Sequence, residues 1–139
     1  MTLKGNRHLV LGRAGMDLYA DPPGTEIPHA TRFVAHLGGS AANIAVALAR
    51  HGAQAALLTR LSDDAVGRFC LTQLDAYGID RTHVRMTGAD TRTSLAVVET
   101  RLENCQSVIY RNNAADFALT PEDVAQTDFT RYDSLIITG

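Results

Sequence analysis

The feature that most constrains the fold of this chain is an alternation of two kinds of segment. Short apolar runs rich in β-branched residues are typical of strands, and several of the segments between them have the apolar spacing and end signals of helices. Strand and helix alternate through residues 8–86, which predicts an α/β fold with a parallel sheet and crossover helices. The expected strands are His8–Leu11, Ala55–Leu61, Ser94–Glu99, Ser107–Tyr110 and Ser134–Thr138.

The first expected helix covers residues 40–51. Ser40 is a suitable N-cap for it and Gly52 is a suitable terminator. The residues between them are apolar on nearly every side, so the pattern predicts a helix that is buried on several faces.

A second helix is expected over residues 63–77, with Ser62 as its cap and Gly78 as its stop. Its apolar residues follow the i, i+3, i+4 spacing, so one face should be buried and the other should face water. A third, short helix is expected where Thr120 precedes Pro121, because threonine can cap the first turn and proline fits the first helical position.

The strands at 94–99 and 107–110 are separated by a short polar segment around Glu103 and Asn104. They should form an antiparallel hairpin that lies apart from the parallel sheet. The last strand, at 134–138, has the apolar character of a central strand. Ligands of open α/β sheets sit beyond the carboxyl ends of strands, so we expect this chain to be the front part of a longer protein. The alternative is a complete small domain that ends on a strand.

Composition excludes several classes of function. The 139 residues suffice for one domain or a piece of one, and 45% hydrophobic residues are enough to bury a core. A net charge of -2 leaves no basic surplus for a nucleic acid or an anionic membrane. The polar start resembles no secretory signal, and two cysteines, Cys70 and Cys105, suggest neither a disulfide scaffold nor a zinc site. We therefore expect a cytoplasmic protein.

Two glycines that lead directly into the first helix are one candidate for a binding site. Gly38 and Gly39 would let a ligand approach the backbone closely, and free N–H groups at a helix start attract oxygen ligands. Asn43 is a strongly polar residue among apolar first turns, and a buried amide needs partners. A tight turn and an asparagine bonded to nearby backbone account for the same residues equally well. The segment is neither a P-loop nor a GxGxxG motif.

Asp17 and Arg111 are the other candidates. Asp17 follows the first strand closely, and its carboxylate can accept hydrogen bonds from two neighbouring sugar hydroxyls. Arg111 ends a hairpin strand, where a guanidinium suits bidentate recognition of a carboxylate. Taken singly, each is more simply a surface residue. The five histidines have no metal-ligand spacing, so no metal site is predicted.

Taken in order, these segments resemble the ribokinase-like (PfkB) family of carbohydrate kinases, over nearly the whole chain. Where the family commonly has Gly-Asp-Asp before the second helix, this chain has Ser62-Asp63-Asp64. Within the family, the chain looks most like the kinases that act on a keto-deoxy sugar acid in myo-inositol breakdown. The segments that carry the resemblance are residues 12–18, 38–43, 61–69, 110–111 and 115–116.

The resemblance implies a parallel sheet with crossover helices and a small β lid over the sugar site. The lid would be built from segments near residues 16–20, 32–37, 93–99 and 107–110. The resemblance also implies that Asp17, Gly38, Gly39 and Asn43 hold the sugar, and that Arg111 meets the carboxylate of a sugar acid.

The family's Gly-Ala-Gly-Asp segment, which supplies the catalytic base and anion hole near the ATP site, is absent from these 139 residues. The resemblance therefore implies that ATP and Mg²⁺ bind mainly outside them, and that they contain no catalytic residue. We expect the sugar-binding half of an ATP-dependent kinase that phosphorylates a primary hydroxyl of the sugar acid, and we expect this half to be inactive alone.

Two alternatives stay open. One is a 2-keto-3-deoxygluconate kinase or a neutral-sugar kinase of the same family. The other is a non-catalytic module for ligand binding or assembly. An exposed apolar face on the lid sheet would favour a homodimer.

Overall fold

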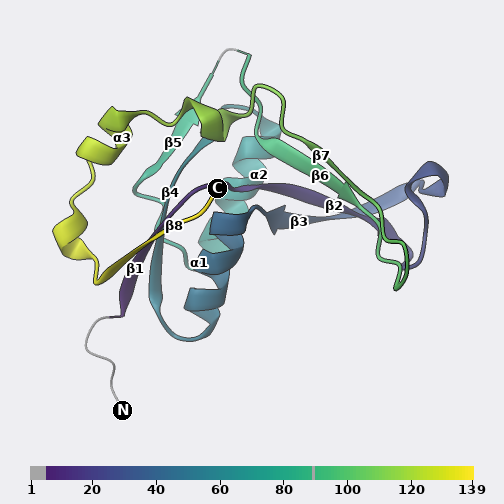
Figure 1. Ribbon diagram of the computed structural model, residues 1–139, viewed down its shortest axis with the longest axis horizontal. Coiled ribbons are helices and arrows are strands. Elements are labelled where there is room, and N and C mark those ends of the chain that lie inside the picture. The colour runs from purple at the N-terminus through teal and green to yellow at the C-terminus, as the bar shows by residue number, and fades with distance from the viewer. Residues whose placement is uncertain (1–5, 89) are drawn as a thin grey trace.

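The computed structural model describes residues 6–88 and 90–139, which form two four-stranded sheets. The first of these, the main sheet, is parallel throughout and has the strand order β5-β4-β1-β8 (Figure 1). This confirms the predicted α/β architecture. Its strands are β1 (Arg7–Leu11), β4 (Gln54–Ser62), β5 (Val84–Thr87) and β8 (Ser134–Ile137).

The core lies between the main sheet and the two longer helices, α1 (Ser40–Arg50) and α2 (Ala65–Ala76). Alternate residues of β1 point to opposite faces of the sheet. Val10 packs on the helix side, whereas Leu9 belongs to a smaller cluster on the opposite side. Both side chains are fully buried, so the main sheet is covered on both faces at β1.

The start and the exposure of α1 differ from the prediction. Gly39 is its N-cap, with a φ of +95°, and Ser40 is already the first helical residue. The helix is also not buried on several sides, since Asn43, Ala47 and Arg50 form an exposed stripe. An alanine on the wet side exposes only one methyl group, so an apolar composition does not force burial here.

Helix α2 is capped by Asp64 and not by Ser62. The Asp64 carboxylate accepts hydrogen bonds from the backbone N–H groups of Val66 and Gly67, at 2.9 and 3.0 Å. Ser62 is unavailable as a cap because it ends β4 as a buried residue.

The short third helix, α3 (Pro121–Ala125), begins as predicted. The Thr120 hydroxyl accepts the backbone N–H of Asp123, and the Asp123 side chain accepts the backbone N–H of Thr120. This reciprocal pair satisfies two donors at the helix start. None of the described helices has the length and apolar character needed to cross a membrane.

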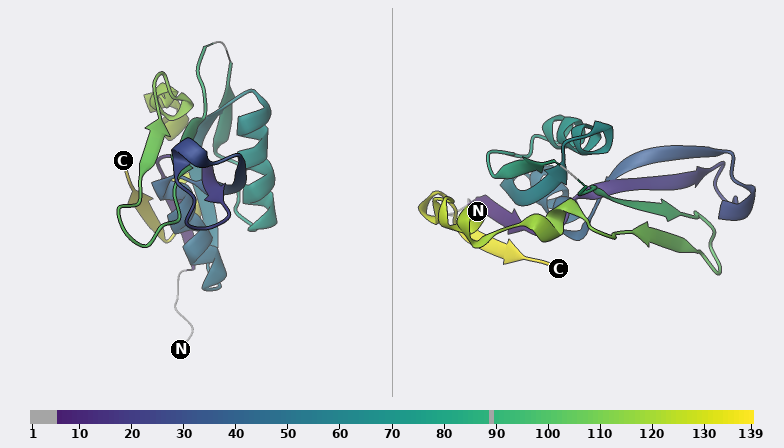
Figure 2. Two further views of the ribbon diagram at one scale, coloured as in Figure 1. Left: turned by 90° about the vertical axis from the view of Figure 1, so that its right-hand side faces the viewer. Right: turned by 90° about the horizontal axis from the view of Figure 1, so that it is seen from above.

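The second sheet has the strand order β3-β2-β6-β7 and extends to one side of the main sheet (Figure 2). Strands β6 and β7 form the predicted antiparallel hairpin, β2 and β3 form another, and the two hairpins join through a parallel β2–β6 pairing. The strands are β2 (Gly15–Asp21), β3 (Arg32–Gly38), β6 (Ser94–Val98) and β7 (Ser107–Tyr110).

A buried pair of hydroxyl residues connects the two sheets. The backbone N–H of Ser62 donates to Thr93 Oγ1 at 2.9 Å, and the backbone N–H of Thr93 donates to Ser62 Oγ at 2.8 Å. Their hydroxyl oxygens are 2.7 Å apart. The end of β4 therefore fixes the start of β6, which holds the second sheet at the carboxyl end of the main sheet.

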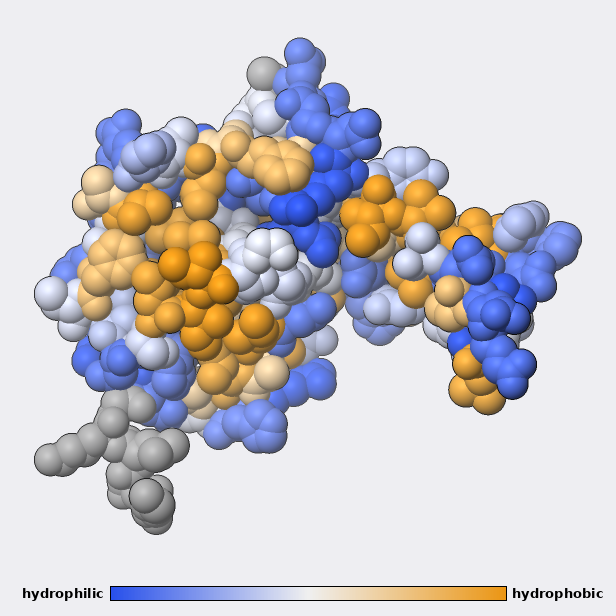
Figure 3. Space-filling model, in the orientation of Figure 1, coloured by the Kyte–Doolittle hydropathy of each residue, from blue (hydrophilic) through white to orange (hydrophobic). Residues whose placement is uncertain are grey.

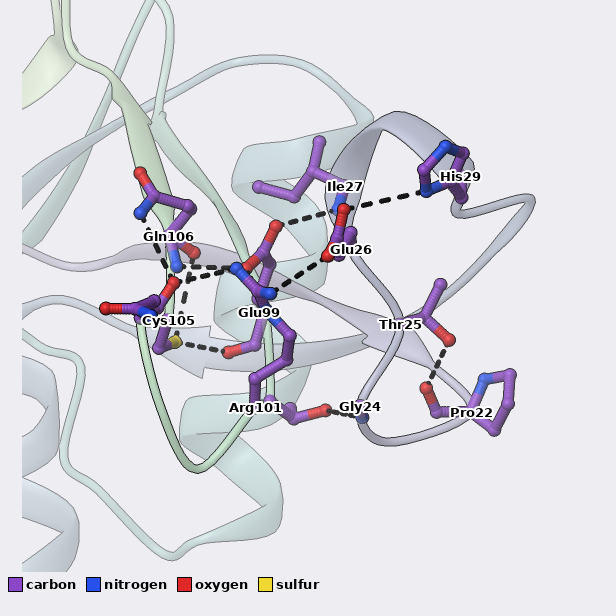
Figure 4. Close-up of polar contacts among 12 residues, drawn as sticks. Pro22, Gly24, Thr25, Glu26, Ile27, His29, Glu99, Arg101, Cys105 and Gln106 are labelled. Atoms are coloured by element: carbon purple, nitrogen blue, oxygen red, sulfur yellow. Dashed lines mark hydrogen bonds and ion pairs between the residues drawn. The ribbon is translucent and has the colours of Figure 1, made fainter.

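The far tip of the second sheet is held by the buried carboxylate of Glu99 (Figure 4). It accepts hydrogen bonds from the backbone N–H groups of Ile27 and Gln106, at 2.9 and 3.1 Å, and from Arg101 Nε at 2.8 Å. Arg101 also pairs with Glu26. One side chain thus joins the loop between β2 and β3 to the loop between β6 and β7.

Apolar side chains remain exposed at the outer strand of the main sheet. Figure 3 shows apolar surface over β8, where Leu135 is 43% exposed and Ile137 is 68% exposed. Among the described strands, β8 pairs with β1 alone.

Candidate functional site

Asp17 lies in the middle of β2, so neighbouring strands fix its position on both sides. It stands opposite His36 of β3 and opposite Ala96 of β6. Because side chains alternate along a strand, residues at matching positions share one face of the second sheet. That face contains the Asp17 carboxylate.

Gly38 ends β3 and lies directly against Asp17. A β-carbon at residue 38 would overlap both oxygens of the Asp17 carboxylate. The absence of a side chain at residue 38 is therefore what leaves room for the acid.

Gly39 brings the start of α1 against the loop between β1 and β2. A β-carbon at residue 39 would collide with the backbone of Arg13 and Ala14. In the first turn of the helix, the backbone N–H of Ala42 donates to the carbonyl of Arg13 at 3.3 Å. Gly39 thus allows the start of α1 to pack closely against the loop between β1 and β2, and its positive φ makes the turn into the helix.

A cavity of about 350 Å³ lies between the start of α1 and the Asp17 face of the second sheet. It contains the Asp17 carboxylate, the Asn43 amide and the Ser40 hydroxyl on its polar side, and side chains of β6 and β7 on its apolar side. This mixture suits a small ligand with several hydroxyl groups. The lining residues are Arg13, Asp17, Gly39, Ser40, Asn43, Ala96, Val98, Ser107 and Ile109.

Asn43 lines this cavity and is exposed, so the expectation that its amide is buried is wrong. The reason is its position on the outer stripe of α1, which faces away from the main core. Its amide is free to donate and accept hydrogen bonds toward a ligand.

The charge of Asp17 is set by opposing effects. Partial burial raises the pKa of its carboxyl group, while the nearby charges of Arg13 and His36 lower it. Burial is the larger effect, so the pKa lies above its ordinary value. Desolvation of this kind makes a carboxylate a strong acceptor for hydroxyl groups that replace water around it.

Arg111 is not among the residues that line this cavity. Its guanidinium forms an ion pair with Asp116, at 2.5 Å, and lies over the ring of Phe117 at 4.4 Å from the ring centre. The Asp116 side chain is only 8% exposed. The structure thus brings together Asp17, Gly38, Gly39 and Asn43, whereas Arg111 does not line this cavity and pairs with Asp116.

Arg13 is a charged residue of the cavity that the sequence analysis did not predict. It stands four positions before Asp17 and directly after Gly12. A cation placed in the loop at the carboxyl end of a parallel strand was the available signal, because such loops surround ligands in open α/β sheets.

A second hollow, of about 450 Å³, lies further along the same sheet face and is lined by Tyr19, Asp21, Val34 and His36, among others. The Tyr19 and His36 rings meet edge to face at 5.3 Å. The Asp21 carboxylate in this hollow is already paired with Arg32 at 2.9 Å. Within residues 6–88 and 90–139, no three His, Cys, Asp or Glu side chains are grouped so as to hold a metal ion.

A parallel sheet with crossover helices, and a two-hairpin sheet standing over a polar cavity, define a ribokinase-like α/β protein. The model of the pfkB carbohydrate kinase family matches residues 6–139. The chain belongs to this family.

Similar proteins agree on the class. A 5-dehydro-2-deoxygluconokinase of Photobacterium profundum is 37% identical over 131 residues, which cover 94% of this chain and 40% of that protein. A PfkB protein from Polaromonas has a TM-score of 0.75 at 30% identity, over 84% of this chain and 39% of the other. A fructokinase from Xylella fastidiosa, solved with bound ATP, has a TM-score of 0.72 at 28% identity, over 86% and 37%. The chain spans about 40% of the length of such relatives.

Proposed function

We propose that this chain forms the sugar-binding half of an ATP-dependent kinase that phosphorylates the primary hydroxyl of a keto-deoxy sugar acid, of the kind represented by 5-dehydro-2-deoxygluconate. The observation that carries the proposal is the common cavity of Asp17 and Asn43 at the start of α1. Family membership and the names of several relatives support the same reaction class.

In this proposal the polar groups of the cavity orient the sugar. The Asp17 carboxylate accepts hydrogen bonds from two adjacent hydroxyls, and the Asn43 amide donates to one oxygen while accepting from another. Gly38 leaves the acid its space, and Gly39 keeps the helix start close to the ligand. Positioning of this kind is most of what a phosphoryl-transfer enzyme must provide on the acceptor side.

The second sheet acts as the lid. Its Asp17 face covers the cavity, so a small closing movement would exclude water, which otherwise competes with the sugar for the phosphoryl group. At Arg111, the sugar carboxylate would have to bind next to the acid of Asp116, with which the guanidinium is paired.

ATP supplies the phosphoryl group in this reaction, and Mg²⁺ offsets the charge of its phosphates. The side chains of the described residues offer no cluster that fits Mg²⁺. We therefore place ATP and its metal mainly on segments that the longer relatives have beyond the matched part, and we derive no step through them.

The proposal is tested with the full-length protein, ATP and a panel of sugars. We expect the highest kcat/KM with 5-dehydro-2-deoxygluconate and no turnover by the 139-residue chain alone. A higher kcat/KM with 2-keto-3-deoxygluconate or with fructose would favour the other kinases of the family. Failure to phosphorylate any sugar would contradict the proposal, and so would turnover by the isolated chain.

Self-association through the second sheet is part of the same proposal. Its two outer strands expose apolar side chains on the face away from Asp17, among them Phe33 of β3, 39% exposed, and Val108 of β7, 47% exposed. Burying such a surface favours a homodimer. Sedimentation of the full-length protein tests this, and a monomer at all concentrations would contradict it.

A further inference from the structure

We infer that Arg13, rather than Arg111, is the main residue that recognises the carboxylate of the acidic sugar. This inference rests on the proposed function, because it names how the same cavity would select its substrate. It starts from a difference between the two arginines: Arg13 lines the cavity that holds Asp17 and Asn43, and Arg111 does not.

The position of Arg13 is fixed by its own backbone. Its carbonyl accepts the N–H of Ala42 in the first turn of α1, and Gly39 packs directly against that carbonyl. The residue therefore stays beside the helix start even if its side chain moves. A guanidinium carried by a fixed backbone segment stays within reach of the cavity and can bind an anion there.

The Arg13 guanidinium has donors to spare. Of its five N–H groups, only one makes a hydrogen bond within the described part of the chain, to Ser94 Oγ at 3.3 Å, which is long for such a contact. An incoming carboxylate would replace a weak hydrogen bond with two short charge-assisted ones.

Arg111 differs from Arg13 in its charge balance rather than in its number of free donors, because it too makes one side-chain hydrogen bond among the described residues, to Asp116, and its Nε has no partner there. Its positive charge is offset by Asp116, and its guanidinium is covered on one side by the Phe117 ring. A substrate carboxylate that bound there would have to compete with the nearly buried acid of Asp116.

Charge also predicts which way round the acid binds. The negative charge of Asp17 repels the carboxylate of the ligand, whereas the positive charge of Arg13 attracts it. Arg13 lies close enough to Asp17 to lower the pKa of the Asp17 carboxyl group. The carboxylate should therefore turn toward Arg13, and the hydroxyl groups should turn toward Asp17 and Asn43.

The test compares Arg13→Gln, Arg13→Lys and Arg111→Gln in the full-length protein, with the exposed Arg81→Gln as a control. Each is assayed with the sugar acid and with a neutral analogue in which a hydroxymethyl group replaces the carboxylate. We expect Arg13→Gln to raise KM for the acid by about 10- to 100-fold, as for a lost charge-assisted contact, and to leave KM for the analogue within about twofold. Arg13→Lys should lie between Arg13→Gln and the parent.

Equal losses for the acid and the analogue in Arg13→Gln would overturn the inference, because they indicate a structural role. A larger selective loss in Arg111→Gln than in Arg13→Gln would also overturn it, while leaving the proposed function intact. If the parent turns over neither sugar, the proposed function fails; calorimetric binding of the acid to the parent and to Arg13→Lys then still decides the role of Arg13. A several-fold weaker binding to Arg13→Lys supports it, and equal binding overturns it.

Discussion

Gly38 lies so close to the carboxylate of Asp17 that a β-carbon at residue 38 would overlap both carboxylate oxygens. The two residues sit diagonally across the antiparallel β2–β3 pair, since Asp17 stands opposite His36 and Gly38 is two residues further along β3. Diagonal neighbours on one sheet face are close enough for side chains to touch. The glycine is thus a steric condition for the position of the acid.

The first prediction is that Gly38→Ala displaces the Asp17 carboxylate. The new methyl group must push the acid into another rotamer or bend the strand, at a cost of about 1–3 kcal/mol in unfolding free energy. We expect KM for the sugar to rise at least about tenfold, as for a lost contact to a charged group.

Gly88→Ala is the matched control for this change. Gly88 has no neighbouring atom within 4 Å of the position of a β-carbon, and its backbone is not in the left-handed region. Thermal unfolding and sugar kinetics of both variants give the comparison. Equal KM values for Gly38→Ala and the parent would show that Asp17 does not need this space.

The second prediction concerns Asp17→Asn, which should lose sugar binding but gain stability. Burial raises the pKa of Asp17 above its ordinary value of 3.8. Between that value and the raised one, the folded protein binds more protons than the unfolded chain, so stability falls as pH rises through this window and stays lower above it. Asparagine removes the loss, and at neutral pH the variant should melt at a higher temperature than the parent.

Melting curves recorded from pH 3 to pH 8 test this prediction, and the difference in melting temperature should shrink toward the acidic end. Ser107→Ala, in the same cavity but without a charge, is the control and should show no pH-dependent difference. A variant that is less stable than the parent at neutral pH would show that Asp17 makes a net favourable contribution to folding.

How far the sequence determined the structure can be seen at single residues. Thr120 caps α3 as predicted, because Pro121 fits only at the first helical position and so fixes where the helix begins. The hairpin over residues 94–110 was predicted from two strand patterns and the short polar connection between them. These signals are local. The order of strands in the second sheet depends on a parallel β2–β6 pairing between segments about 80 residues apart, which no local pattern encodes.

The errors have the same origin. Ser62 and Asp64 are both suitable N-cap residues. Thr93, from a distant part of the chain, forms hydrogen bonds with Ser62, and this leaves Asp64 as the cap. Asn43 was expected to be buried because its neighbours are apolar, yet its stripe of α1 faces the cavity. Arg13 became a candidate only when folding placed it beside Asp17.

The third prediction is that Asp64→Ala destabilises the protein by about 1 kcal/mol, the usual cost of a lost N-cap. Two backbone donors at the start of α2 lose their acceptor. Asp64→Asn should cost less, because its amide oxygen can still cap the helix. The neighbouring Asp63→Ala is the control, since the Asp63 side chain is 65% exposed and, among the described residues, pairs with Arg68 alone. Chemical denaturation of the three variants measures the differences, and equal effects at residues 63 and 64 would contradict the assignment of the cap.

The fourth prediction is that Glu99→Gln loosens the tip of the second sheet. A neutral amide accepts weaker hydrogen bonds than a carboxylate, and it ends the ion pair with Arg101. The backbone N–H groups of Ile27 and Gln106 should then exchange with deuterium at least several-fold faster than in the parent. Glu103→Gln, an exposed acid in the same loop, should leave both rates unchanged.

The same carboxylate makes this protection depend on pH. The hydrogen bond from the Ile27 backbone is the largest of the contacts that lower the pKa of Glu99 below its ordinary value of 4.5; Gln106 and Arg101 add to it, and burial opposes it. A lowered pKa stabilises the folded tip above the ordinary value, and this contribution is lost as pH falls through the lowered one. Protection in the parent, corrected for intrinsic exchange, should therefore decline only below about pH 4.5, while Glu99→Gln should show no such decline. Equal pH profiles for the two proteins would mean that Glu99 does not hold the two loops together.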